Sequence, residues 1–368
     1  MSDRSDPAHD GENDSTDGRR FTPDRRTLLG SAVAGSALLG GIGVTGVAGQ
    51  GNGKGRGKGN EDGNDGSGGF PPDGITEYGR AVNLGDGRVR TFTSETPSGE
   101  PKYHGVEFDR DAFDGLPKAE DLADADNRAE TDKYREDGQA ATVHFKESLQ
   151  FFVPFPDAAE TPFTFLGLNW NPGGHFGGKG AWLKPHFDVH FHMLEPATVD
   201  AIEGPGLPPY DTGNDEYTSE DGSNSDPWDP DPDGEVTETN FDFDQLPEGY
   251  ERPPAPVADQ RYIRDMGEHT APSDAPELPD GPDDVGDPDR FSNTLIQGFV
   301  GDEEGSRLAF VEPMVTLEFL EGFDGTEKYD VPQPGAYPHD LRHPHGYSVR
   351  DLPSKDAIAV VLEDFEEV

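Results

Sequence analysis

Cysteine is absent from this sequence of 368 residues. A chain without thiols forms no disulfide, and it offers neither a thiolate nucleophile nor a cysteine ligand for zinc. A transition-metal site in this protein would therefore use imidazole and carboxylate groups in place of thiolates.

Positive charge is scarce. The chain has 29 Lys and Arg side chains against 75 Asp and Glu, which gives a formal net charge of -46. So large an excess of negative charge repels phosphate backbones and excludes nucleic-acid binding through a basic surface. Only 10 of the basic residues are Lys, and the acidic residues are spread over the whole chain. Such a surface suits a protein that stays hydrated in multimolar salt, so we expect a halophilic, haloarchaeal protein.

Hydrophobic residues make up only 31% of the chain, which excludes a polytopic membrane protein but leaves apolar material for one or two cores. Near the N-terminus, Arg25-Arg26 precedes an uncharged run rich in Gly and Ala. This pattern predicts a twin-arginine export signal over residues 1–48, cleaved near Ala48. The alternative is a retained membrane anchor, which seven Gly residues within the run disfavour. After cleavage we expect no stable membrane insertion and an extracellular or cell-surface location.

Residues 49–74 are Gly-rich and are predicted to form a flexible linker. A single antiparallel β-sandwich or barrel domain with a few short helices is predicted over residues 75–368. We expect strands at 82–84, 89–94, 103–108, 142–155, 163–168, 186–194, 294–300, 308–312, 315–320 and 357–362, and one or two helices within 111–137. The acidic stretch 211–243 is too polar to be buried, and we expect a disordered loop insertion there, with 271–290 a smaller stretch of the same composition.

Four of the eleven His residues fall within residues 175–192. Because side chains alternate along a strand, one face of the expected strand 186–194 would carry His186, Asp188, His190 and His192. The other face would carry Phe187, Val189, Phe191 and Met193, which can pack into a core. The Phe and Val residues and the preceding Pro185 favour a strand over a helix.

Strand spacing limits which of these side chains could bind one ion. Residues two apart lie about 6.7 Å apart, so neighbouring pairs can reach a shared ion, with further ligands from other strands. His186 and His190 are about 13 Å apart and cannot do so alone. Three interpretations stay open: a metal site, acid–base chemistry without a metal, or a solvated or hydrogen-bonded polar face. Zinc, iron, manganese and copper would all suit a His and carboxylate ligand set.

Several motifs resemble an uncharacterised family of exported domains, whose best-known member belongs to a bacterial extracytoplasmic sigma-factor regulon. The motifs are Trp170-Asn171-Pro172 with Gly174-His175, Pro185-His186-Phe187-Asp188 with His190-Phe191, Met266-Gly267-Glu268-His269, Val311-Glu312-Pro313-Met314-Val315-Thr316, and Pro344 with Gly346-Tyr347-Ser348-Val349. The resemblance covers roughly residues 78–365. It implies a β-rich fold and a homo-oligomer, without a known activity. Family members usually have Tyr where this chain has His192 and Trp where it has Thr270.

The resemblance implies six polar site residues: His175, His186, Asp188, His190, His269 and Glu312. We predict that His190, with His186 or Asp188 beside it, meets His269 and Glu312 around one pocket, with His175 closing over it. Such a set would bind a divalent transition metal and leave a position open for water.

The sequence therefore predicts an exported, metal-binding β-domain of unknown activity, and it does not decide whether the protein is an enzyme. The alternative is a non-catalytic envelope or stress-response protein in which the His and Asp cluster is structural. A third possibility is a site for a small ligand of unknown chemistry in the mouth of a barrel.

Overall fold

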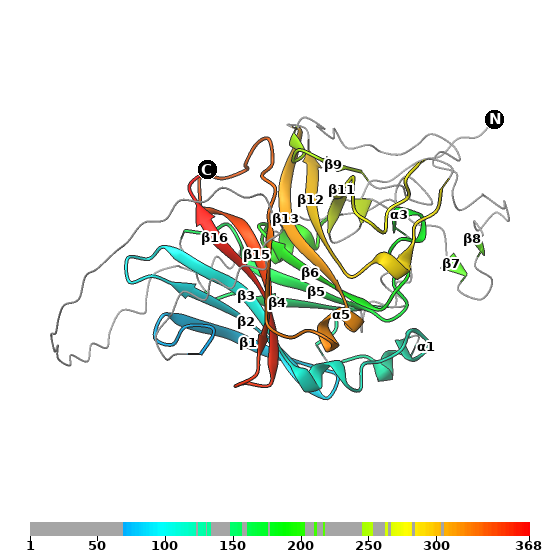
Figure 1. Ribbon diagram of the computed structural model, residues 1–368, viewed down its shortest axis with the longest axis horizontal. Helices are drawn as coiled ribbons and strands as arrows, with labels where there is room; N and C mark the ends of the chain where they lie inside the picture. The colour runs from blue at the N-terminus through cyan, green and yellow to red at the C-terminus, as the bar shows by residue number, and fades with distance from the viewer. Residues whose placement is uncertain are drawn as a thin grey trace, which may run out of the picture. The chain divides into compact units, whose positions relative to one another are not determined.

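Two antiparallel β-sheets form the framework of the chain that the computed structural model describes (Figure 1). The described residues are 69–122, 124–129, 131–133, 148–156, 160–175, 177–202, 210–211, 216–217, 245–252, 262–263, 266–281, 284–302 and 305–368. All of them belong to one compact unit, Gly63–Val368. They confirm a mainly β fold with a few short helices. The predicted export signal, most of the predicted linker and nearly all of the acidic stretch 211–243 lie outside the described residues, so these three stay predictions.

The first sheet combines the two ends of the described chain, and its strands are blue, cyan and red in Figure 1. Its spatial order is β1 (Thr76–Leu84), β2 (Gly87–Glu95), β3 (Pro101–Asp109), β16 (Ala357–Glu366), β15 (His343–Leu352) and β14 (Thr326–Asp330). The hairpin between β1 and β2 pairs Leu84 with Gly87 and turns at Gly85, which has a positive φ of 54°. A Cβ at Gly85 would lie 2.2 Å from the Asp114 carbonyl oxygen, so this turn requires glycine.

The second sheet is formed by the middle of the chain, in green to orange in Figure 1. Its order is β10 (Tyr262–Ile263), β11 (Gly267–Pro272), β12 (Asn293–Asp302), β13 (Gly305–Thr316), β6 (His186–His192), β5 (Phe165–Asn171) and β4 (Leu149–Pro154), and β9 (Tyr250–Glu251) pairs with β11. The short strands β7 (Tyr210–Asp211) and β8 (Glu216–Tyr217) pair separately. Strand β6 lies inside this sheet, between β13 and β5, and all seven of its residues are buried.

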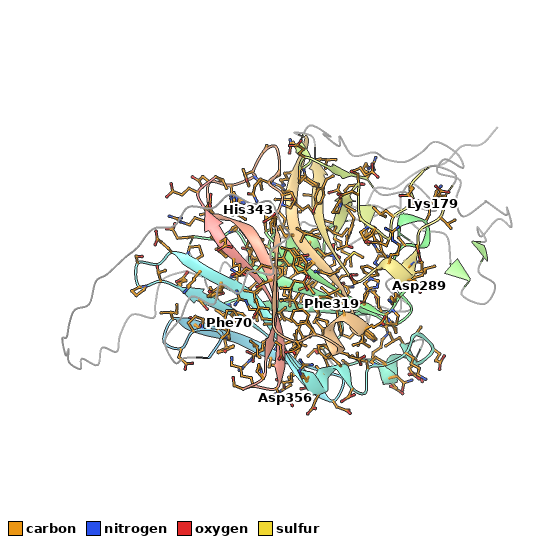
Figure 2. All side chains as sticks on the ribbon, viewed as in Figure 1. Phe70, Lys179, Asp289, Phe319, His343 and Asp356 are labelled. Carbon is orange, nitrogen blue, oxygen red and sulfur yellow. The ribbon has the colours of Figure 1, made fainter. Side chains whose placement is uncertain are left out.

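The main hydrophobic core lies between the two sheets, which makes the domain a sandwich (Figure 2). Phe187, Val189 and Phe191 on β6 are fully buried in this core. The Phe187 ring centroid lies 5.4 Å from that of Phe108 on β3 of the other sheet. The predicted alternation of β6 is therefore present, and its His and Asp side chains point to the opposite face of the second sheet.

Helices are single turns: α1 (Ala119–Leu122), α3 (Gly177–Gly180), α4 (Pro196–Val199), α5 (Leu317–Glu321), and the 3-10 turns η1 (Arg110–Phe113), η2 (Ala125–Asn127) and η5 (Pro288–Arg290). The predicted strand 315–320 is wrong. Strand β13 ends at Thr316, whose hydroxyl accepts a hydrogen bond of 3.2 Å from the Phe319 N–H and so caps α5. Within the described ranges, no helix has the length and hydropathy needed to cross a membrane.

Candidate metal site

The polar face of β6 lies away from the sandwich core, beneath a second apolar cluster. Four side chains on this face, His186, Asp188, His190 and His192, are at most 1% exposed. The cluster that lies on the same side of the sheet includes Ala181, Trp182, Met266, Leu278, Phe291, Phe310 and Met314. Burial of this many polar groups is costly unless hydrogen bonds, protons or cations satisfy them.

The register of the second sheet brings ligands from three strands together. The antiparallel register pairs Phe310 with His192 and Met314 with Asp188, which puts Glu312 of β13 opposite His190. His269 of β11 lies opposite Gly298 of β12, which in turn lies opposite Phe310. The Phe310 ring covers Gly298 and contacts both imidazoles, with centroids 4.9 Å from His190 and 5.1 Å from His269. His269 and Glu312, which are 43 positions apart in the sequence, thus meet at one point.

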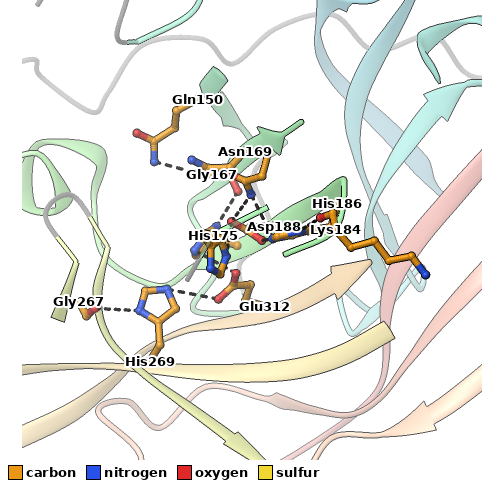
Figure 3. Close-up of polar contacts among 12 residues, drawn as sticks. Gln150, Gly167, Asn169, His175, Lys184, His186, Asp188, Gly267, His269 and Glu312 are labelled. Atoms are coloured by element: carbon orange, nitrogen blue, oxygen red, sulfur yellow. Dashed lines mark hydrogen bonds and ion pairs between the residues drawn. The ribbon is translucent and has the colours of Figure 1, made fainter. Parts of the chain in front are cut away.

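His190, His269 and Glu312 form the first triad, whose ligand atoms all lie within 4.8 Å of one another. Nε2 of His190 lies 3.4 Å from Oε1 of Glu312, and Nε2 of His269 lies 3.6 Å from Oε2. Nδ1 of each imidazole faces a backbone carbonyl instead, that of Gly167 at 3.3 Å and that of Gly267 at 3.0 Å; Figure 3 shows the contacts of His269 with Glu312 and Gly267. These carbonyls favour the tautomer with the proton on Nδ1, so both Nε2 lone pairs face the carboxylate.

The separations in the first triad match those of ligands around a shared ion. Two atoms bound at about 2.1 Å in a tetrahedral sphere are about 3.4 Å apart. A neutral N–H···O hydrogen bond is shorter, at about 2.9 Å. Neither His190 Nε2 nor Glu312 Oε2, both buried, has a hydrogen-bond partner within the described part of the chain. The triad therefore has the spacing of a coordination sphere and not that of a hydrogen-bonded cluster.

His175, His186 and Asp188 form a second triad, again with ligand atoms within 4.8 Å of one another. The Asp188 carboxylate contacts Nε2 of His186 at 3.0 Å and Nε2 of His175 at 3.8 Å. Nδ1 of His186 donates to the Lys184 carbonyl at 2.6 Å (Figure 3). The Asn171 amide donates to Asp188 Oδ2 at 2.7 Å and lies 3.3 Å from His186 Nε2.

The structure thus divides the six predicted site residues differently from the sequence analysis. The tips of His190, His269 and Glu312 lie together, as shared ligands should. His186 and Asp188 do not join them but lie with His175. Asp188 and His190 are two positions apart on the strand, so their side chains are far enough apart to contact different partners.

Asn171 contacts both Asp188 and His186 but was not predicted as a site residue from the sequence. The alternation of Gly167, Asn169 and Asn171 along β5 is the signal that could have found it, since these positions line the same face as the His residues of β6. Gly167 makes room for the imidazoles: a Cβ there would lie 2.8 Å from Nε2 of His192.

Burial and contacts shift the titration of the site. Burial lowers the pKa of His190 to about 3 and raises the pKa of Glu312 well above its usual range. For Asp188, burial alone would raise the pKa, but the contacts with His186 and His175 hold it well below the usual range. Neutral imidazole is the form that binds metal, so burial keeps His190 in that form.

Comparisons with known proteins were negative. No protein-family model matches the chain, no curated protein matches it, and no solved structure matches it. The resemblance to the exported domain family therefore stays a prediction from its motifs.

Proposed function

We propose that this protein binds a divalent transition-metal ion through His190, His269 and Glu312. The observation that carries the proposal is the convergence of two imidazole Nε2 atoms and a carboxylate, 3.4 and 3.6 Å apart, with both Nδ1 atoms turned towards backbone carbonyls. Acceptor atoms that face one another in a buried site repel unless a proton or a metal cation lies between them. A metal ion supplies that positive charge and satisfies all three groups at once.

Two His and one Glu leave coordination positions open. Structural zinc sites use four protein ligands, whereas catalytic sites use three and keep a position for water or substrate. The same ligand types also suit iron(II), manganese and copper. His269 is the most exposed of the three ligands, with 14% of its side chain exposed, so we propose that an exogenous ligand approaches from its side. We further propose that the predicted export signal and acidic surface place this site outside the cell, in high salt.

The test is metal binding by the full chain without a His tag, stripped with a chelator and kept in multimolar salt. We expect retained metal after desalting, by elemental analysis, and a higher melting temperature with Zn²⁺, Mn²⁺, Fe²⁺ or Cu²⁺. At 100 times the Kd, binding stabilises the folded protein by about 2.7 kcal/mol. Glu312→Gln and His269→Ala should each lose one bound ion.

The matched control is His345→Ala, which removes a half-buried His lying 3.8 Å from Glu366 and outside both triads. It should bind metal as the wild type does. The alternative function, a structural His and Asp cluster without metal, predicts no metal-dependent shift in any variant. Equal shifts in the wild type and in Glu312→Gln would assign binding elsewhere and contradict the proposal.

A further inference from the structure

We infer that the second triad, His175, His186 and Asp188, binds a second divalent cation, so that the protein holds two metal ions side by side along β6. This inference rests on the proposed function of the first triad. Its ligand set repeats the first in kind, with two imidazoles and one carboxylate whose ligand atoms lie within 4.8 Å of one another.

The contact between His186 and Asp188 supports cation binding at the second triad. Nδ1 of His186 donates to the Lys184 carbonyl at 2.6 Å, so Nε2 presents its lone pair to the carboxylate. Oδ1 of Asp188 lies only 3.0 Å from that nitrogen, yet this buried oxygen has no hydrogen-bond partner within the described ranges. The contact is short enough for a hydrogen bond but lacks its geometry. The Nε2 lone pair accepts the Asn171 amide at 3.3 Å, and a cation beside the carboxylate would replace that donor at Nε2 and satisfy Oδ1 as well.

The backbone before β6 holds His175 over the same point. Gly174 has a φ of 74°, and a Cβ there would lie 2.2 Å from the Trp182 carbonyl oxygen, so only glycine permits this close turn. The His175 N–H donates to that carbonyl at 3.3 Å, and its ring contacts the His186 ring with centroids 4.7 Å apart. The backbone of this turn, together with ring contacts to Trp182 and His186, places the His175 imidazole beside the Asp188 carboxylate.

Asn171 provides a fourth polar group beside the triad. Its side-chain amide nitrogen lies 2.7 Å from Oδ2 of Asp188 and 3.3 Å from Nε2 of His186. Rotation of the amide by about 180° would replace this donor by its oxygen, which is a suitable ligand for a divalent cation. Asn171 therefore donates to Asp188 without the ion and can contribute oxygen with it.

The two ions would lie close together. Asp188 and His190 are two positions apart on one strand face, about 6.7 Å, and Glu312 lies opposite His190. Each triad brings one carboxylate, so each ion would keep about one positive charge.

The experiment counts ions in the full chain. Mn²⁺ titration with elemental analysis should give two ions per wild-type chain. Asp188→Asn and His175→Ala should each give one, Glu312→Gln should give one, and Asp188→Asn combined with Glu312→Gln should give none. Electron paramagnetic resonance of the wild type should show the dipolar broadening of neighbouring Mn²⁺ ions, and each single variant should lose it.

Asn171→Asp and His345→Ala are the matched variants. Adding a carboxylate at position 171 should tighten binding of the second ion about tenfold, whereas His345→Ala should keep two ions. Circular dichroism confirms that each variant is folded, and His175→Ala stands in for Asp188→Asn if the latter does not fold.

The outcomes separate the two proposals. One ion in the wild type, lost in Glu312→Gln and kept in Asp188→Asn and His175→Ala, would overturn the second site and leave the proposed function intact. No ion in the wild type would overturn both. Two ions with no dipolar broadening would show that the sites are separate, and would overturn the paired arrangement.

Discussion

Gly298 shows how a single residue without a side chain makes the first triad possible. The Phe310 ring lies over it and beside both the His190 and His269 imidazoles, and a Cβ at Gly298 would lie 1.9 Å from the ring. Phe310 is fully buried, and closely packed interiors resist added volume.

We therefore predict that Gly298→Ala lowers the free energy of unfolding by about 1–3 kcal/mol and weakens metal binding at the first triad. Chemical denaturation and metal titration measure the two effects. Gly173→Ala is the control, because a Cβ at Gly173 meets nothing within 4 Å and its cost should stay within about 0.5 kcal/mol. Equal stabilities for the two variants would show that Phe310 can move aside freely.

His343, labelled in Figure 2, predicts a stability that depends on pH. Its side chain is fully buried, and burial, with smaller effects of His339 and His345, lowers its pKa to about 3. The unfolded chain protonates the same group near pH 6.5. Between about pH 6.5 and pH 3 the unfolded state therefore binds the extra proton, and stability falls as pH falls.

For each unit by which the pH falls within this window, protonation of His343 in the unfolded chain should lower the free energy of unfolding by about 1.4 kcal/mol. His343→Phe removes the titrating group, so its stability should fall less steeply than that of the wild type between pH 6.5 and 4.5. Denaturant midpoints at several pH values, at constant salt, measure both slopes. Parallel curves for the two proteins would contradict the assignment of this pH dependence to His343.

At the scale of elements, Arg128 joins the helical segment to the edge of the second sheet. Its guanidinium donates to the Leu122 carbonyl at 3.0 Å, to the Asp132 carboxylate at 2.7 Å and to the Ser148 carbonyl at 3.0 Å. Asp132 in turn accepts a hydrogen bond of 2.9 Å from the Gln150 N–H on β4. This network fixes α1 and η2 against the start of β4.

Removal of one partner leaves a buried charge uncompensated, so Arg128→Ala should lower the free energy of unfolding by about 3–5 kcal/mol. The control is Arg88→Ala, whose ion pair with Asp109 is exposed and should contribute less than about 1 kcal/mol. Urea denaturation compares both with the wild type. A small effect of Arg128→Ala, similar to that of Arg88→Ala, would show that β4 does not depend on this network.

The sequence predicted the elements whose patterns are local. Strict alternation identified β6, and the expected strands at 82–84 and 89–94 fall within β1 and β2. Strand β11 was not predicted, because its polar residues Glu268 and His269 follow Gly267 without an apolar run. The place of His269 in the first triad depends on the order of the strands in the sheet, in which β11 lies two strands from β13. The division into two triads could not be predicted either, since it depends on the turn that returns His175 to β6.

At the scale of the whole molecule, a net charge of -46 predicts a strong dependence on salt. Lowering the salt from 1 M to 0.1 M lengthens electrostatic screening from about 3 Å to about 10 Å, so repulsion between surface carboxylates grows. We expect the melting temperature to fall markedly over this range. A melting temperature independent of salt would contradict the halophilic prediction.

The backbone carbonyls behind the imidazoles have a consequence for how the protein would choose among metals. Nδ1 of each imidazole faces a backbone carbonyl: His190 that of Gly167, His269 that of Gly267 and His186 that of Lys184. The Nε2 ligand atoms are therefore preorganised before an ion arrives. A flexible site adapts to each ion and follows the Irving–Williams order, in which copper binds tightest. A rigid site instead imposes its own geometry, and an ion that demands a square-planar arrangement gains less from it. The fold would thus favour the ion whose preferred coordination geometry matches the site. Metal selectivity would then depend on this match more than on the intrinsic affinity of the ion.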